Sequence, residues 1–438
     1  MMQNLIILPS ADHLKLLDVL AILMLLIHIP YMGIVLGSTA ISLFFAIKDK
    51  IQASERTQRL GRDVLEIVPL HIPVFFMLGA LPLLTLMLIY SEWFYQTSLQ
   101  ITNYFGFVIG TTVVGLLFVY IYSTFRKKGN NITYFTLGIG CVGLLILKNA
   151  YYVLISTLTI FLFPEYWSIL DLPLPVVYSW NAVARFMIFI ISCCALTGLG
   201  ILFFWFYQKK KEFDEVYGKF VKIFASALAM VGVFLLPACM LWNIGTMPTA
   251  SFSTLMFIFY AIIFLLLAIV GYLLFRIISE PQFPVSAKSF VLFIFVIFFL
   301  ITTDELAKEN VNRGHVIVLS DKAELVKEQM EDKRTAGMKV TADLGLGEQI
   351  YKNKCSTCHA FDHKVVGPSH NEVLPKYVND QETLKKFIRN PWKVNPSYPQ
   401  MPAQGLNKKE VESVVAYMMK HIGAEPKAPP AEQKTVVK

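Results

Sequence analysis

A five-residue motif in the last quarter of the chain combines side chains that can hold a porphyrin. Cys355-Ser356-Thr357-Cys358-His359 is a C-x-x-C-H pattern, in which two thiols two residues apart bond the two vinyl groups of one haem. The adjacent His359 then lies under the iron and supplies its proximal nitrogen. A zinc site would need a second pair of Cys or His ligands, and a redox C-x-x-C would need no histidine. The motif therefore predicts one covalently attached haem c.

Several elements around this motif are needed to position a haem. A helix is predicted over 347–354, directly before the motif, and an amphipathic helix is predicted over 408–421. Between them lie a Gly-Pro pair at 367–368 and the pair Met401-Pro402, which stands in a proline-rich loop. The pattern predicts a small helical domain with a methionine-bearing loop.

With these motifs, the segment 343–422 resembles the class I monohaem cytochromes c. In that family the methionine of a Met-Pro loop is the distal iron ligand, so the resemblance implies that Met401 binds the iron. His363 and His370 remain competing distal ligands, and Met401 as an ordinary core residue remains the other interpretation. The resemblance also implies that the haem is attached outside the cytoplasmic membrane.

The rest of the chain has the composition of a membrane protein. Of 438 residues, 55% are hydrophobic and only 16% are charged, whereas a soluble domain has about 25% charged residues. Residues 304–438 contain 21 Lys/Arg and 18 Asp/Glu, which is 39 of the 70 charged residues. The net charge of +8 is no sign of nucleic-acid binding, because Lys and Arg also mark the cytoplasmic loops of membrane proteins. We expect an all-α chain with a polytopic helical membrane bundle over 1–303, a charged spacer over 304–342, a cytochrome c domain over 343–422 and a disordered tail over 423–438.

A membrane-spanning helix needs about 20 apolar residues. Eight segments meet this condition approximately: 15–47, 64–90, 101–125, 132–162, 176–207, 219–245, 251–278 and 286–303.

The loops between these spans alternate in their content of Lys and Arg. Basic residues crowd the loops after spans one, three and five, whereas the loops 91–100, 163–175 and 246–250 contain neither Lys nor Arg. By the positive-inside rule both termini then face outward. This agrees with a haem c outside the membrane and predicts a multi-pass protein of a bacterial cytoplasmic (inner) membrane, with its cytochrome domain on the periplasmic or outer side.

Four of the ionisable residues within the predicted spans stand out, because ionisable residues inside a membrane usually have a function. They are His28, His71, Lys148 and Arg185. A b-type haem needs His or Met axial ligands, and its propionates need basic partners, so His28 and His71 are candidate ligands, with Lys148 and Arg185 as propionate partners. The other interpretation pairs these groups with one another or with backbone, without a cofactor. One b-type haem, two, or none are compatible with the pattern, but two haems with two histidines each are excluded because the spans contain only two histidines.

Residues 15–207 also resemble subunit I of the cytochrome bd-type oxidases. The shared features are an outward N-terminus, His28 in the outer half of span one and a glycine-containing span three that ends in a basic loop. The resemblance implies that His28 is a haem ligand. Span three contains no Glu, where that family has carboxylates, and Phe186, Met187 and Ile190 stand where a second haem histidine is expected. These differences favour electron transfer over oxygen reduction.

Three functions follow from these patterns. The first is a membrane-bound respiratory electron-transfer subunit, an oxidoreductase component that passes electrons between its haem c and soluble or membrane-bound cytochromes and docks with other subunits of a respiratory complex. The second is a bd-like terminal reductase of oxygen or nitric oxide, fed through the fused cytochrome c. The third is a scaffold or anchor subunit with no haem in the membrane.

Overall fold

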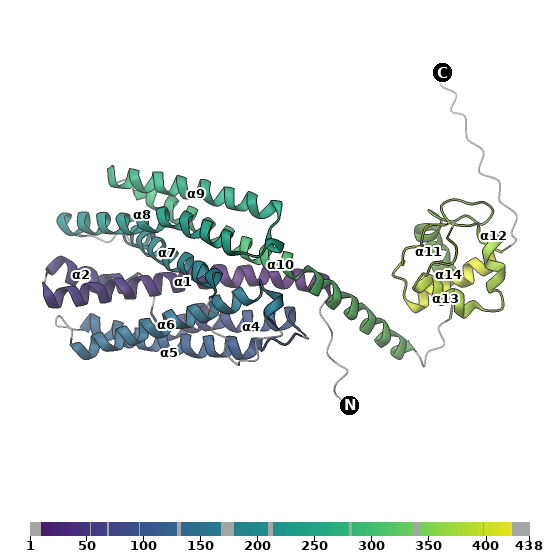
Figure 1. The fold of residues 1–438 in the computed structure, drawn as a ribbon, viewed down its shortest axis with the longest axis horizontal. Helices are drawn as coiled ribbons and strands as arrows, with labels where there is room; N and C mark the ends of the chain where they lie inside the picture. Colours follow the sequence, from purple (N-terminus) through teal and green to yellow (C-terminus); the bar gives the residue numbers. More distant parts are fainter. Residues whose placement is uncertain are drawn as a thin grey trace, which may run out of the picture. The chain divides into compact units, whose positions relative to one another are not determined.

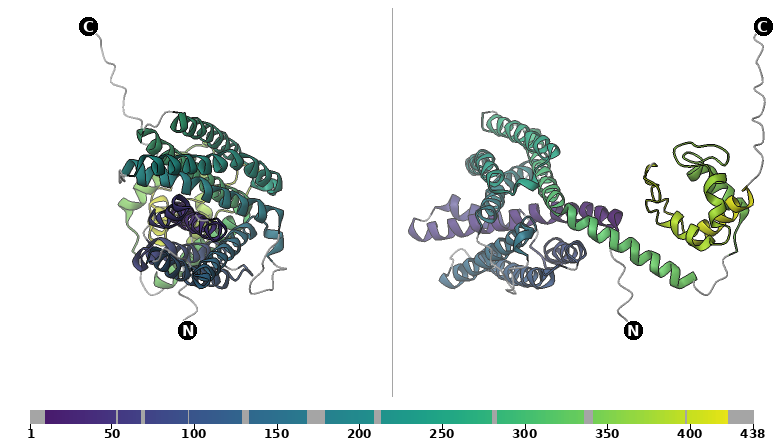
Figure 2. Two further views of the ribbon diagram at one scale, coloured as in Figure 1. Left: turned by 90° about the vertical axis from the view of Figure 1, so that its left-hand side faces the viewer. Right: turned by 45° about the vertical axis from the view of Figure 1, so that its right-hand side comes forward.

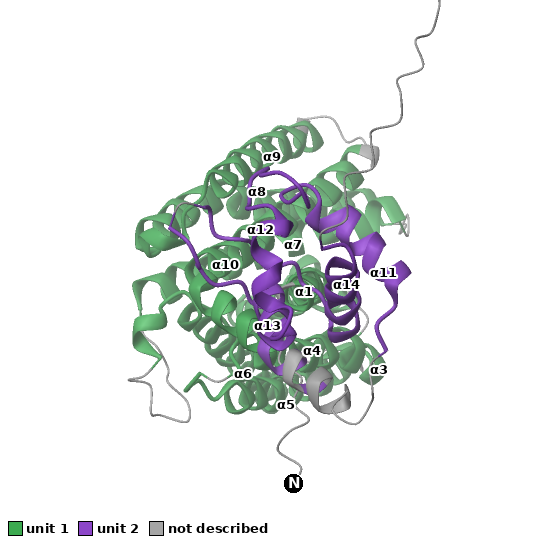
Figure 3. Ribbon diagram, turned by 90° about the vertical axis from the view of Figure 1, so that its right-hand side faces the viewer, with its two compact units in different colours: residues 1–323 green, residues 324–438 purple. Residues whose placement is uncertain are grey.

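The computed structural model describes residues 10–52, 54–67, 70–95, 97–128, 133–167, 179–208, 213–279, 283–335, 341–396 and 398–422. The predicted disordered tail over 423–438 and residues 336–340 of the predicted spacer lie outside the described residues. The described chain divides into two compact units, residues 1–323 and 324–438, which Figure 3 draws in different colours.

Unit one is a bundle of long helices, and eight of its helical segments are long and apolar enough to cross a membrane (Figure 1). The all-α fold class with about eight spans is thereby confirmed for the part of the chain that the structure describes, although the second span begins at Ile72 and not at residue 64. The long helices are α1 (Ala11–Ile51), α4 (Leu81–Trp93), α5 (Ile101–Lys128), α6 (Tyr134–Ile160), α7 (Trp180–Ile201), α8 (Glu215–Thr246), α9 (Thr254–Ser279) and α10 (Phe283–Thr335).

Short helical segments extend or connect these helices. The second span runs from Ile72 to Trp93 because α3 (Ile72–Val74) and the π-helical turn η2 (Phe75–Ala80) lead directly into α4. A second π-helical turn, η4 (Leu202–Gln208), prolongs α7 in the same way. The remaining short segments of this unit are α2 (Glu55–Asp63), η1 (Val64–Glu66), η3 (Pro164–Tyr166) and η5 (Thr249–Ser251).

Helix α1 runs through the bundle and packs against α7 along a row of small residues (Figure 2). A Cβ atom at Gly33 would lie 2.8 Å from a methyl carbon of Leu196, and a Cβ at Gly37 would overlap the Thr197 side chain. On the other side of α7, a Cβ at Gly198 would lie 2.7 Å from the backbone nitrogen of Ala229 on α8. Small residues let helix backbones approach closely inside a bilayer, where apolar side chains gain little from leaving lipid. These glycines therefore place α7 in the centre of the bundle.

The loops at one end of the bundle are joined by polar contacts between distant parts of the chain. Arg59 of α2 forms an ion pair with Asp214, 2.6 Å from Nη1 to Oδ1, and the hydroxyl of Tyr217 donates to Asp63 at 3.1 Å. The buried Arg126 of α5 donates to the backbone oxygen of Gln58 at 3.4 Å. The basic loops after spans one, three and five thus meet at a single end, as an alternating topology requires.

Helix α10 begins inside the bundle and continues without interruption to Thr335. It includes residues 304–335, the first part of the sequence predicted to be a charged spacer. This stretch is rich in Glu, Lys, Ala and Leu, which favour helix, and its only glycine is Gly314. No proline interrupts it, so nothing in the local sequence ends the helix at the edge of the apolar segment.

Unit two contains a small helical domain with its own core. Its segments are α11 (Leu344–Ile350), the π-helical turn η6 (Tyr351–Cys355), α12 (His370–Val373), η7 (Leu374–Tyr377), α13 (Gln381–Arg389) and α14 (Lys408–Lys420). Helices α11 and α14 cross closely at Gly347. A Cβ at this position would lie 2.9 Å from the Cβ of Tyr417. Ile350, Leu384, Val414 and Met418 are among the buried residues that form the core between these helices.

Candidate haem c site

The C-x-x-C-H motif lies at the end of a helix and folds back on itself. Helix α11 continues through η6, which ends at Cys355, and the backbone oxygen of Cys355 accepts hydrogen bonds from the N–H groups of Cys358, at 3.1 Å, and His359, at 3.0 Å. The oxygen of Cys358 accepts from the N–H groups of Val366 and Gly367 at 3.1 and 2.9 Å. The two thiols and the imidazole are therefore presented on one tight turn.

The imidazole of His359 is oriented by a backbone carbonyl. Its Nδ1 lies 3.0 Å from the oxygen of Pro368, and since a carbonyl can only accept, Nδ1 carries the proton. This leaves Nε2 as the free lone pair, which is the arrangement that metal-ligating histidines adopt. His359 thus fits the proximal ligand of a haem iron, and a Cβ at Gly367 would lie 2.7 Å from Nδ1 and 2.8 Å from Nε2. Only glycine leaves room for the ring at this position.

The two cysteines fit attachment better than redox catalysis. Both are half-buried free thiols, and burial raises the pKa of Cys355 to about 11. A redox-active C-x-x-C motif instead lowers the pKa of its attacking cysteine, since the thiolate is the nucleophile. No cluster of three or more His, Cys, Asp or Glu side chains that could hold a metal ion occurs among the described residues. The residues present therefore fit a haem and not a zinc ion.

Met401 lies in an irregular loop that is tied to the motif. Its side chain is half-buried. Lys354, next to Cys355, donates to the backbone oxygen of Gln404 at 2.8 Å, which holds this loop to the motif. Met401 as the distal ligand stays a prediction, supported by its place in a loop bonded to the motif helix.

The two competing histidines lie in different environments. His363 is exposed, and its Nδ1 contacts Asp362 at 2.8 Å. His370 is buried, stacks on His359 with 4.9 Å between ring centroids, and has no hydrogen-bond partner on either nitrogen among the described residues. Burial, followed by the neighbouring His359, lowers the pKa of His370 to about 4. The ring of His370 thus lies against that of His359, and His363 and His370 stay alternative predictions for the distal ligand. The sequence analysis did not predict this stacking of His370 on His359. The only signal for it was the position of His370, two residues after the Gly367-Pro368 pair.

His28 is buried in the middle of the bundle with both ring nitrogens engaged. Its Nδ1 lies 2.9 Å from the backbone oxygen of Leu78, and its Nε2 lies 2.5 Å from the hydroxyl of Tyr151. These contacts join α1 to η2 and α6. A backbone carbonyl and a tyrosine hydroxyl are thus the hydrogen-bond partners of this imidazole, and His28 as a haem ligand stays a prediction.

The other predicted membrane residues do not gather around His28. His71 was expected inside the second span, but it is exposed and has extended backbone just before Ile72, the first helical residue. The reason is Pro73, which suits the first turn of a helix and leaves His71 at the cap position. Lys148 is exposed on α6. Arg185 forms an ion pair with Asp304 of α10 and donates to Thr159 at 3.2 Å.

The comparisons with known proteins bear on unit two. Residues 342–418 match the family described as cytochrome c oxidase, cbb3-type, subunit III. Cytochrome c-551 of Azotobacter vinelandii is 34% identical over 79 residues, which cover 17% of this chain and 96% of that protein. No solved structure matches the chain.

A cytochrome c domain carries a covalently bound haem c and transfers electrons, and here it is joined to a membrane-spanning helical part. Through this C-terminal domain, the chain belongs to the cytochrome c family.

Proposed function

We propose that the chain is a respiratory electron-transfer subunit anchored in the bacterial cytoplasmic membrane. The haem supplies a one-electron couple when it is bound. Cys355 and Cys358 hold it, His359 is the proximal ligand and Met401 the distal ligand. The observation that carries this proposal is the hydrogen bond from His359 to Pro368, which leaves Nε2 free beside the two thiols. In cytochromes with Met and His ligands the sulfur raises the reduction potential, which suits exchange with other cytochromes.

The partners are other redox proteins on the outer side of the membrane. The positive-inside rule places the basic loops inward and both termini outward, and the contacts between Arg59 and Asp214 and between Arg126 and Gln58 support a common end for those loops. The domain is proposed to exchange electrons with soluble or membrane-bound cytochromes, while the bundle docks with other subunits of a respiratory complex. Cysteine labelling from outside intact cells tests this orientation: a cysteine introduced at exposed Glu165 should react, and one introduced at exposed Arg56 should not.

A pyridine haemochrome spectrum of the purified full-length protein tests the cofactor. We expect one haem c per chain, and loss of covalent haem in the double variant Cys355→Ala/Cys358→Ala. Cys141→Ala, which removes a half-buried thiol in α6, is the matched control and should keep the haem. A wild-type chain without haem c would overturn the proposal.

The same spectrum decides between the alternatives for the bundle. The contacts of His28 with Leu78 and Tyr151 favour a structural role, which predicts no haem b and a spectrum unchanged in His28→Ala and His71→Ala. A haem b that His28→Ala removes would support the bd-like interpretation. Consumption of oxygen or nitric oxide with a reduced cytochrome c would then show a terminal reductase. Failure to exchange electrons with any soluble cytochrome would favour the scaffold role.

A further inference from the structure

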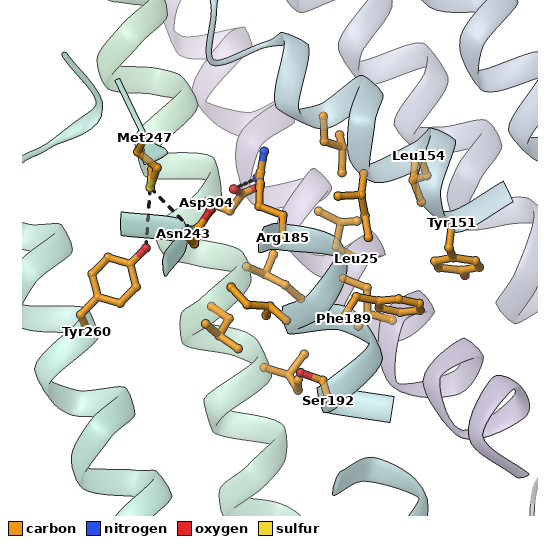
Figure 4. Close-up of a pocket in the computed structure, with 17 residues that line it drawn as sticks. Leu25, Tyr151, Leu154, Arg185, Phe189, Ser192, Asn243, Met247, Tyr260 and Asp304 are labelled. Atoms are coloured by element: carbon orange, nitrogen blue, oxygen red, sulfur yellow. Dashed lines mark hydrogen bonds and ion pairs between the residues drawn. The ribbon is translucent and has the colours of Figure 1, made fainter. Parts of the chain in front are cut away.

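A cavity of about 130 Å³ lies inside the bundle, between α1, α6, α7, α8, α9 and α10. A single water needs only about 10–15 Å³ on such a measure, so the cavity has room for a molecule of many atoms. Leu and Ile side chains provide most of its wall, and polar side chains lie at two places, most of them at one end and Ser192 apart from them (Figure 4). The polar residues that line it are Arg185, Ser192, Asn243, Tyr260 and Asp304 (Figure 4). Mostly apolar walls with a few convergent polar groups are typical of ligand sites.

One hydrogen-bond donor at the polar end, the hydroxyl of Tyr260, has a poor acceptor, whereas the side-chain amide of Asn243 is hydrogen-bonded to that hydroxyl. The side-chain amide of Asn243 lies 3.6 Å from the sulfur of Met247, and the hydroxyl of Tyr260 lies 3.9 Å from the same sulfur (Figure 4). A thioether is a weak acceptor. Asn243 and Tyr260 are both buried, so a ligand carbonyl oxygen would provide the Tyr260 hydroxyl with a stronger acceptor than the Met247 sulfur does.

Ser192 provides a second and independent sign of a ligand. It lines the cavity two helical turns from Arg185 on α7, or about 10 Å along the helix. Its side chain is buried, with 2% of the residue exposed, and its hydroxyl has no hydrogen-bond partner among the described residues. An unpaired buried hydroxyl is unfavourable, so a polar atom of a ligand is expected here. The cavity thus offers polar contacts at two places separated by an apolar stretch.

The charges at the polar end are compensated, which favours a neutral ligand. Arg185 pairs with Asp304, Lys308 lies 3.4 Å from Asp304, and Lys308 also pairs with Glu305 at 2.6 Å. An anionic head group would therefore meet Asp304 beside an Arg185 that is already paired. A phospholipid phosphate does not suit this end.

We propose that this cavity binds the ring of a quinone or quinol. The ring is neutral and apolar, and it bears oxygen atoms on opposite edges. Asn243 and Tyr260 can donate to a quinone carbonyl, and Asp304 can accept from a quinol hydroxyl. Ser192 can do either, so both redox forms find partners. The inference rests on the proposed respiratory role, to which it adds a lipid-soluble partner bound within the membrane.

Photolabelling of the full-length protein tests the site. The probe is a short-chain azido-quinone added to detergent-purified protein, with decylubiquinone and a naphthoquinone of equal chain length as competitors. We expect labelled peptides from α7, α8 or α10 that include lining residues, and loss of label with at least one competitor. The competitor that displaces the label identifies the ring class. Label confined to residues outside the cavity would overturn the proposal.

Matched variants make the test specific. Leu300→Trp fills the cavity from α10, and Leu292→Trp makes the same change at a half-buried leucine of α10 that does not line the cavity. We expect quinone affinity to fall at least tenfold in Leu300→Trp and to stay within twofold in Leu292→Trp. Wild-type affinity in Leu300→Trp would contradict the assignment.

A second pair of variants removes one hydroxyl from each of two buried serines, Ser192 and Ser226, neither of which has a hydrogen-bond partner within the described part of the chain. Ser192→Ala should weaken quinone binding about fivefold, as expected for one hydrogen bond, and Ser226→Ala should not. Native mass spectrometry of the purified protein tests whether a phospholipid occupies the cavity instead. A bound phospholipid that is lost in Leu300→Trp, but that quinone does not displace, would overturn the proposal. All of these variants should keep the haem c spectrum, so failure here is distinct from failure of the proposed function.

Discussion

Gly367 lies directly against the imidazole of His359, so that a side chain at 367 would occupy the place of the ring. The Gly-Pro pair therefore has two effects on one histidine: the glycine admits the ring, and the oxygen of Pro368 fixes its Nδ1 proton.

Gly367→Ala should displace His359 and weaken its bond to Pro368. A Cβ 2.7 Å from Nδ1 forces a shift of the ring or of the backbone. We expect the free energy of unfolding of the cytochrome domain to fall by roughly 1–3 kcal/mol, as in other overpacked sites. Guanidinium unfolding followed by haem absorbance measures this. Gly345→Ala is the control, since its Cβ would lie 3.4 Å from the nearest atom, and an equal loss in both variants would contradict the prediction.

Met401→Leu should leave the haem iron without its proposed distal ligand. We expect ferrous haem in this variant to bind carbon monoxide and the reduction potential to fall by roughly 0.1–0.3 V, a part of the ~0.8 V range that axial ligands control. Met419→Leu on α14 is the control and should behave as wild type. A Met401→Leu variant with wild-type potential and no carbon monoxide binding would point to one of the histidines as the ligand.

Asn407→Ala should destabilise the cytochrome domain through the start of α14. Asn407 accepts a hydrogen bond from the N–H of Glu410 at 3.0 Å, and the Glu410 carboxylate accepts from the N–H of Asn407 at 2.8 Å. Loss of such a cap costs about 1 kcal/mol. Asn407→Ser should retain most of the stability because serine also caps helices. Equal unfolding midpoints for Asn407→Ala and wild type would count against this role.

Asp380 should make the stability of the domain depend on pH in the acid range. Hydrogen bonds from Thr383 lower the pKa of Asp380 below its ordinary value of 3.8. Because the pKa of Asp380 is lower in the folded state, its contribution to the free energy of unfolding is fully present above the unfolded-state pKa. This contribution is lost as the pH falls through the folded-state pKa. Asp380→Asn keeps the cap but does not titrate. The difference in unfolding free energy between wild type and Asp380→Asn should therefore be constant above about pH 5 and change below pH 4. A difference that is constant from pH 6 to pH 3 would contradict it.

Asp304→Ala should destabilise the membrane bundle because it leaves Arg185 without its carboxylate. Removing one partner of a buried ion pair typically costs about 3–5 kcal/mol, whereas replacing both by apolar residues costs much less. The double variant Arg185→Met/Asp304→Leu should therefore melt at a higher temperature than the single variant. Glu309→Ala, at an exposed position one turn along α10, is the control. Thermal unfolding in detergent measures all three.

The haem-attachment motif could be predicted from the sequence because its residues lie close together in the chain. The two thiols and His359 lie within five residues, and the Gly-Pro pair follows within ten, so spacing alone specifies their geometry. The eight spans were readable for the same reason, since each depends on the hydropathy of one continuous segment.

The contacts inside the membrane were not readable because they join distant segments. Arg185 finds its carboxylate 119 residues later in the chain, and no local pattern specifies that partner. The available signal was the spacing of Asp304 and Lys308, which lie four residues apart just after an apolar segment, because this spacing places two charges on one helix face. His71 was misplaced because hydropathy continues across Pro73, while the backbone begins its helix only at Ile72.

The ion pair between Arg185 and Asp304 also has a consequence for the biogenesis of the protein. During synthesis α7 enters the bilayer long before α10 exists. At about 5–20 residues per second, synthesis of the 119 residues from Arg185 to Asp304 takes roughly 6–24 s. An unpaired arginine in a membrane helix is unfavourable by up to about 2.5–3.5 kcal/mol during this time. The helix that neutralises this charge directly precedes the cytochrome domain in the chain. The bundle therefore reaches its full set of contacts only when the ribosome is about to translate the haem-binding segment.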